Sequence, residues 1–181
     1  MNDQPILEDA RLLLRPLQPA DRDFIFRHFS DPQVTRYLLD EPPLADLAGA
    51  DELIQVYLDP AAQARCNRWV ILLKDGGQPV GTCGFHAWSH VNHRAEIGYD
   101  LAPDCWGRGI MSAAVRLAID YAFQNMQLNR IAAVVYVENE PSARLLGRLG
   151  FRLEGCLRAY HCLNGVYYDH NLFSLLRQDW V

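Results

Sequence analysis

Apolar and polar positions follow two different periods along this chain. Near the N-terminus the apolar run Arg11–Leu17 predicts a strand. Two stretches with apolar residues at helical spacing follow, at Pro19–Phe29 and at about Asp46–Leu58, and prolines at Asp31-Pro32 and Pro42-Pro43 interrupt the pattern. The chain is therefore expected to open with one strand and two helices.

The rest of the chain alternates strand patterns with helix patterns. Strands are predicted at Trp69–Leu73, Val80–Trp88, Arg94–Leu101 and Ile131–Val137. Helices are predicted at Ile110 to about Asn125 and from Glu138–Pro141 to Gly150. Residues Phe151–Leu176 have the pattern of a hairpin that turns at Leu163-Asn164-Gly165. The predicted order, β-α-α-β-β-β-α-β-α-β-β, is that of an α/β chain whose sheet mixes parallel and antiparallel pairs.

The composition is that of an ordinary globular protein. The chain has 181 residues, of which 50% are hydrophobic and 22% charged, and we expect one domain spanning residues 1–181. No apolar run approaches the ~20 residues of a membrane-spanning helix. The first residues lack the basic and apolar segments of a signal peptide. We therefore expect a cytoplasmic protein without a membrane partner, and its five scattered cysteines are expected to be reduced.

The net charge of −5 narrows the choice of partners. Binding to nucleic acid requires a basic surface that neutralises phosphates, so the acidic balance argues against a nucleic-acid partner. A cationic substrate such as an amine is compatible with this charge. Exposed strands near the C-terminus are compatible with a homodimer.

The segment Leu101–Ser112 contains the most informative local pattern. A predicted strand ends at Leu101, a loop with Gly107 and Gly109 follows, and a helix begins at Ile110. A helix N-terminus offers unpaired N–H donors and the positive end of the helix dipole, and glycines let the backbone approach an anion. The pattern fits a pyrophosphate site but is neither a P-loop nor the G-x-G-x-x-G fingerprint. The alternative is an ordinary strand-to-helix turn.

The residues around this loop resemble the acetyl-CoA motif of the GNAT superfamily. Ala95–Leu101 followed by Trp106–Met111 is similar to its Q/R-x-x-G-x-G/A pattern, with Gly109 as the fixed glycine. Trp106 replaces the usual Gln or Arg, and Met111 replaces the last small residue. Both departures resemble the RimJ/RimL-type branch, the N-terminal acetyltransferases of ribosomal proteins.

Further segments in the same order strengthen the resemblance. They are Val137–Ser142 with Gly150-Phe151, then Leu153–Arg158 with Leu163–Gly165 and Tyr168-Asp169, and the opening Arg11–Pro16. The resemblance implies the GNAT fold: a mostly antiparallel central sheet with one splayed parallel strand pair and flanking helices. It also implies an acetyltransferase whose co-substrate is acetyl-CoA.

The same resemblance implies which residues bind acetyl-CoA. The backbone of Leu101 would contact the thioester end, and Asn139 would contact the cofactor arm. The phosphates would be held by the backbone amides of Trp106, Gly107, Arg108, Gly109, Ile110 and Met111.

Ser142 is the candidate acid that protonates the leaving CoA thiolate. It matches the serine of the family and lies one helical turn after Asn139, so both side chains share a helix face. Many members of the superfamily use a tyrosine one turn further along, where this chain has Leu146. The alternative role of Ser142 is to stabilise the first turn of its helix.

Glu96 and His161 are the candidate bases. An α-amine has a pKa of ~8, against ~10.4 for lysine, so a modest base suffices. Glu96 lies on the strand that runs to Leu101, up to ~16 Å from it, so it would act through water or a bridging substrate. Its alternative role is pairing with Arg94 or Arg130. His161 stands where related enzymes tend to have a glutamate; histidine titrates near neutral pH, but a lone strand histidine is more often structural.

A metal site is not expected. His86, His90 and His93 lie close in sequence, but residues four apart in a strand are separated by ~13 Å, and no cysteine or carboxylate completes a site.

The acceptor is expected to be the N-terminal α-amine of a protein, with a small amine such as an antibiotic, a polyamine or an amino-acid derivative as the alternative. A cofactor-binding module without catalysis is a third hypothesis.

Overall fold

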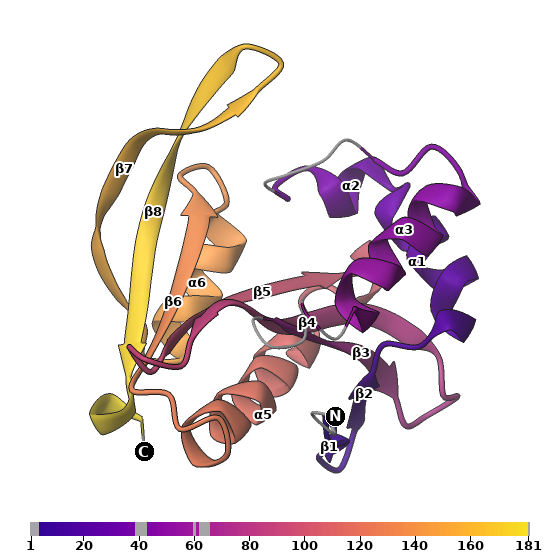
Figure 1. The fold of residues 1–181 in the computed structure, drawn as a ribbon, viewed down its shortest axis with the longest axis horizontal. Coiled ribbons are helices and arrows are strands. Elements are labelled where there is room, and N and C mark those ends of the chain that lie inside the picture. The colour runs from indigo at the N-terminus through magenta and orange to yellow at the C-terminus, as the bar shows by residue number, and fades with distance from the viewer. Residues whose placement is uncertain (1–3, 39–42, 60, 62–65, 181) are drawn as a thin grey trace.

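A computed structural model describes residues 4–38, 43–59, 61 and 66–180 (Figure 1). Its strands are β1 Leu7–Glu8, β2 Leu12–Pro16, β3 Asn67–Leu73, β4 Pro79–Ser89, β5 Arg94–Leu101, β6 Arg130–Tyr136, β7 Arg152–Leu163 and β8 Val166–Leu176. Its helices include α1 Arg22–Phe29, α2 Pro32–Thr35, α3 Leu47–Leu58, α5 Ile110–Gln124 and α6 Glu140–Arg148. The predicted mixed α/β architecture is confirmed. The short β1 and α2 are additions to the predicted order.

The expected break at Asp31-Pro32 separates two helices. Helix α1 ends at Phe29, and the Asp31 side chain accepts a hydrogen bond from the Gln33 amide at the start of α2. Pro32 occupies the first turn, where its missing N–H leaves no unpaired donor. The proline therefore ends one helix and begins the next.

All strands form one sheet, in the order β1-β2-β3-β4-β5-β6-β8-β7. Every neighbouring pair is antiparallel except β5 and β6, which are parallel. Their pairing covers only Arg94–Glu96 against Arg130–Ala132. Beyond these residues β5 continues beside β4 to Leu101, and β6 continues beside β8 to Tyr136. The two strands therefore diverge and leave a gap inside the sheet.

The two faces of the sheet pack against different helices (Figure 1). Val70 of β3 packs with buried residues of α1 and α3, including Ile25 and Ile54. Its neighbours Trp69 and Ile71 point into the larger core that contains residues of α5 and α6. Alternate residues of each strand thus serve either the α1–α3 face or the α5–α6 face.

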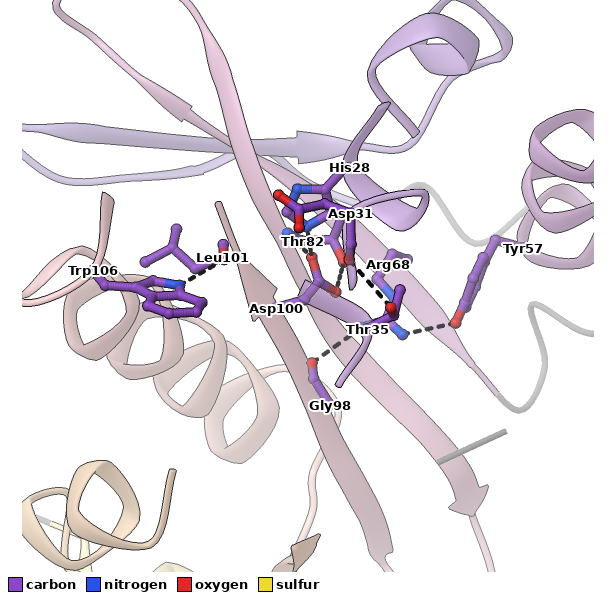
Figure 2. Close-up of polar contacts among 10 residues, drawn as sticks. All are labelled: His28, Asp31, Thr35, Tyr57, Arg68, Thr82, Gly98, Asp100, Leu101 and Trp106. Carbon is purple, nitrogen blue, oxygen red and sulfur yellow. Dashed lines mark hydrogen bonds and ion pairs between the residues drawn. The ribbon is translucent and has the colours of Figure 1, made fainter. Parts of the chain in front are cut away.

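A buried polar cluster attaches α1 to the sheet (Figure 2). Oδ1 of Asp100 accepts a hydrogen bond from the Thr82 amide at 2.9 Å and lies 2.6 Å from Nε2 of His28. Its Oδ2 accepts from the Thr82 hydroxyl at 2.6 Å. Burial opposes ionisation of Asp100, but the hydrogen bond and charge of His28, the Arg68 charge and the Thr82 hydrogen bond outweigh it and lower its pKa. Asp100 is therefore an ionised carboxylate with both oxygens occupied.

The last two strands form the long hairpin that the sequence predicts. Strand β7 lies at the edge of the sheet, and the hairpin rises beyond the other strands (Figure 1). Large apolar side chains are exposed near its turn, at Tyr160, Leu163, Val166 and Tyr167. The homodimer stays a prediction. Among the residues described, no helix is both long enough and apolar enough to cross a membrane.

Candidate active site

A cavity of about 1180 Å³ opens where β5 and β6 diverge. Residues of α1, α2 and α3 line it on one side, and the loop before α5 and the first turns of α6 line it on the other. The central strands β3 to β6 contribute its floor. The cavity therefore connects the two faces of the sheet, which lets two different molecules meet at the gap.

The loop before α5 has the backbone conformation that its glycines permit. Gly107 has a φ of 71° and Gly109 a φ of 72°, in the left-handed region that glycine adopts without a steric penalty. Gly109 is the N-cap of α5, and the first helical hydrogen bond runs from the Ala113 amide to the Gly109 carbonyl. The amides that precede Ala113 in α5 have no acceptor within the helix, so they are available to an anion.

Most of the residues predicted to bind phosphate border the cavity. Trp106, Gly107, Gly109 and Met111 line it. Arg108 and Ile110 are absent from the lining: the Arg108 carbonyl accepts a hydrogen bond from Nη2 of Arg11 at 3.4 Å, and Ile110 is buried in the core. The contacts of these residues with acetyl-CoA stay predictions.

Leu101 turns its backbone toward the gap. The Ala102 amide donates to the Val80 carbonyl of β4 at 2.8 Å, and backbone groups alternate between the two sides of a strand. The Leu101 N–H and C=O therefore point away from β4. The carbonyl accepts a hydrogen bond from the Trp106 indole at 2.8 Å (Figure 2), so Trp106 joins the end of β5 to the loop before α5.

Asn139 and Ser142 both line the cavity at the start of α6. The Asn139 side chain is the N-cap and accepts a hydrogen bond from the Ser142 backbone amide at 3.2 Å. The Ser142 hydroxyl is free of this capping role and lies 2.7 Å from the Tyr99 hydroxyl. The side chain that caps the helix is therefore that of Asn139, and the Ser142 side chain faces the gap.

Tyr99 lies within the motif Ala95–Leu101, and the sequence pattern assigned it no role of its own. Burial raises its pKa to about 12, against the opposing effect of the Ser142 hydrogen bond, so the phenol stays protonated at neutral pH. It lies two residues before Leu101, hence on the same side of β5. That spacing is the only signal in the sequence, because its partner on α6 is distant along the chain.

Glu96 lies on the opposite face of β5 from Tyr99, and it also lines the cavity. Its Oε2 is 3.6 Å from Nε2 of His86 on β4. The polar contact with His86 lowers the pKa of Glu96 against the effect of burial, with smaller help from the charges of His86 and Arg94. Of the two partners considered from sequence, Arg94 contributes only its charge, and Arg130 pairs with Glu154 instead. Glu96 is therefore ionised at neutral pH.

His161 is not among the residues that line the cavity. It lies on β7, where its ring centroid is 6.3 Å from that of Tyr136 and 6.2 Å from that of His170. Its Nε2 is buried without a hydrogen-bond partner in the described part of the chain. The structure therefore groups Ser142 and Glu96 around one cavity and leaves His161 in the hairpin.

Among the residues that the structure describes, no group of three or more His, Cys, Asp or Glu side chains is placed to hold a metal ion.

Comparison with known proteins agrees with this geometry. The sequence model of the Acetyltransferase (GNAT) domain family matches residues 11–152. The chain is 42% identical over 175 residues to an uncharacterized N-acetyltransferase, p20, of Bacillus licheniformis, which covers 97% of this chain and 98% of that protein.

Two solved structures are similar over nearly their whole length. One is spermidine N-acetyltransferase from Vibrio cholerae in complex with CoA and spermine, with a TM-score of 0.83 and 26% identity over 94% of this chain and 98% of that one. The other is ribosomal-protein-S5-alanine acetyltransferase from Vibrio fischeri, with a TM-score of 0.84 and 25% identity over 98% and 100%.

Gly109→Asp is expected to weaken CoA binding relative to Gly109→Asn. A Cβ at Gly109 would meet only Nη2 of Arg11, at 4.0 Å, so both side chains fit, and both tolerate the left-handed backbone to a similar degree. Only Asp adds a negative charge beside the pyrophosphate, which at ~4 Å costs about 1–4 kcal/mol depending on exposure. Calorimetric titration with CoA should give a dissociation constant about tenfold higher or more for Asp. Equal constants for the two variants would contradict the phosphate site.

Proposed function

Since this chain belongs to the acetyltransferase (GNAT) domain family and is an acetyl-CoA-dependent N-acetyltransferase, we propose that its acceptor is the N-terminal α-amine of a protein. The observation that carries this proposal is that, among the described residues lining the acceptor part of the cavity, Glu96 is the one accessible carboxylate. An α-amine brings one positive charge and, with a pKa of ~8, loses its proton to a modest base.

The similarity to the S5-alanine enzyme supports the same proposal, and with it a place in the RimJ/RimL-type branch. A small amine is the second candidate, because the spermidine enzyme is equally similar in fold. A polyamine carries several ammonium groups, however, and Glu96 matches only one of them. The α-amine is therefore the acceptor that better fits the charges of the cavity.

We propose that Glu96 receives the proton of the acceptor ammonium through water. The neutral amine then attacks the thioester carbonyl, so a C–N bond forms and the C–S bond breaks. The Leu101 N–H, which faces the gap, stabilises the oxyanion that develops on the acetyl oxygen. Ser142 donates its hydroxyl proton to the leaving thiolate and takes a proton from Tyr99, whose phenol is protonated at neutral pH. The attacking nitrogen loses its second proton to water as the amide forms, and water returns one proton to Tyr99, so the relay is restored. Asn139 keeps Ser142 in place by capping α6 and borders the cofactor arm.

Acetylation of short peptides distinguishes the two acceptors. Peptides with a free α-amine and one internal lysine should gain a single acetyl group, located on the α-nitrogen by fragment mass spectrometry. The same peptides with a formylated N-terminus are the control and should stay unmodified. Acetylation only of the lysine, or only of spermidine supplied in parallel, would contradict the proposed acceptor.

Ser142→Ala is expected to lower kcat by about a hundredfold or more while raising KM for the acceptor much less. The backbone amide that Asn139 caps is still present in this variant, so the melting temperature should change little. Tyr99→Phe should lower kcat in the same direction, and Ser142→Thr, which retains a hydroxyl, should recover part of the activity. Normal turnover with a lowered melting temperature in Ser142→Ala would show that the hydroxyl is structural.

The pH dependence of kcat at saturating acceptor separates the two candidate bases. The pKa of Glu96 is lowered, so Glu96 stays ionised as pH falls toward acid values and its loss of function lies below the ordinary glutamate range of ~4.3. Glu96→Gln should therefore reduce kcat across the whole neutral range, and His161→Gln should leave the profile unchanged. A kcat that rises between about pH 5 and 8 in the native enzyme and becomes flat in His161→Gln would instead assign the base to His161.

A further inference from the structure

The cavity differs in charge from the protein as a whole. The chain has a net charge of −5, whereas the described cavity lining contains four arginines and two carboxylates. Arg144 and Arg148 of α6 lie on the side of the loop before α5, and Arg144 already pairs with Glu140 at 2.7 Å. Arg36 and Arg68 lie on the side of α1–α3, where the acceptor enters.

Asp100 cannot attract a second ammonium group. Both of its oxygens already have partners, since Oδ1 faces the Thr82 amide and His28, and Oδ2 faces the Thr82 hydroxyl. Its side chain is nearly inaccessible, with 3% exposed. Glu96 is 35% exposed and therefore remains the carboxylate that an incoming ammonium can reach.

Arg68 contributes a buried positive charge on the same side of the sheet, where Asp100 balances part of it. Arg68 of β3, Gly84 of β4 and Gly98 of β5 are in register, and the end of the arginine side chain lies over Gly98, which carries no side chain. Its Nη1 donates to the Gly98 carbonyl at 3.1 Å and its Nη2 to the Tyr57 hydroxyl at 2.8 Å (Figure 2). Gly98 lies between Glu96 and Asp100 on the same face of β5, and a Cβ there would meet the His86 ring at 3.5 Å and Nη1 of Arg68 at 3.6 Å, so an acceptor that extends from Glu96 toward Asp100 meets His86 and Arg68.

The walls around Arg68 are apolar. Ile25 and Phe29 of α1 and Leu53, Val56 and Tyr57 of α3 line the cavity there. Val56 is 57% exposed although it borders the cavity, so its apolar side chain is not needed to fill the core. Apolar side chains left open in a binding cavity favour ligands with apolar surface to bury.

From these charges and walls, and resting on the proposed function, we propose that the acceptor combines one ammonium group with a large apolar group next to it. For a protein N-terminus, this means a bulky aliphatic or aromatic first residue. The ammonium group lies at Glu96 and the apolar group lies between α1 and α3. Among the described lining residues, a second ammonium group would meet Arg68 or the apolar walls and no further accessible carboxylate, so this part of the pocket disfavours polyamines and first residues such as lysine.

Steady-state kinetics on a matched series of amines tests this proposal. The series consists of one peptide sequence that begins with Phe, Leu, Ala or Lys, together with 2-phenylethylamine and spermidine. The Phe and Leu peptides should exceed the Ala peptide in kcat/KM by about tenfold or more, and the Lys peptide and spermidine should be poorest. A preference for Ala, Lys or spermidine would overturn the proposal, as would a series in which no member is acetylated.

The same series separates this inference from the proposed function. Acetylation of 2-phenylethylamine, with none of the peptides modified, would refute the protein N-terminus as acceptor while supporting an apolar monoamine. Acetylation of every peptide at equal rates would support the N-terminal acceptor and overturn the apolar preference.

Substitution of the exposed wall residue gives a second readout. Val56→Glu adds a carboxylate at the apolar wall, so the ratio of kcat/KM for the Phe peptide over the Lys peptide should fall by about tenfold or more. Val91→Glu is the matched control, because Val91 is 89% exposed and does not line the cavity. Both variants should keep the native affinity for CoA. A ratio that Val56→Glu leaves unchanged would overturn the proposed wall.

Discussion

The short parallel pairing of β5 and β6 is the constraint on which the rest of the site depends. Each strand keeps its antiparallel partner, β4 or β8, along its length, so only one edge of each is left unpaired where they diverge. Backbone N–H and C=O groups that a continuous sheet would satisfy then face the gap. The Leu101 N–H is one of them. The sheet thus presents unpaired backbone groups to the cavity while each strand keeps one paired edge.

The alternation of side chains along β5 separates the two halves of the reaction. Tyr99 points to the α6 side, where Ser142 is its partner, and Glu96 points to the α1–α3 side. The proposed base Glu96 and Tyr99, the partner of the proposed acid Ser142, therefore lie on opposite faces of a single strand. Because both are attached to β5, their separation does not depend on the movement of a loop.

The buried polar residues of the α1–α3 face serve this arrangement in two ways. The cluster of His28, Thr82 and Asp100 fixes α1 against the sheet, and α1 in turn forms a wall of the cavity. Arg68 balances the carboxylate of Asp100 and holds the Gly98 carbonyl and Tyr57. This network of hydrogen bonds and charges thereby sets both the position of the α1 side of the cavity and the charge on that side.

The sequence by itself determined the order of the elements, the mixed sheet and the loop before α5. These features depend on residues close together in the chain: periodicity separates strands from helices, and Gly107 and Gly109 permit the left-handed turn before α5. Likewise, the contact between Asn139 and Ser142 follows from their spacing on one helix. The local sequence pattern was sufficient to predict a feature wherever the residues that form it belong to one helix or strand or to the loop at its end.

Only the tertiary structure decided which distant side chains meet. Tyr99 and Ser142 are 43 residues apart, and their contact depends on where α6 crosses the gap. Strand register gives Glu96 the partner His86 rather than Arg130, and it lays Arg68 over Gly98. The hairpin places His161 outside the cavity lining, although its sequence position resembles that of a base. Such pairings depend on register and helix crossing, which periodicity within a single element does not specify.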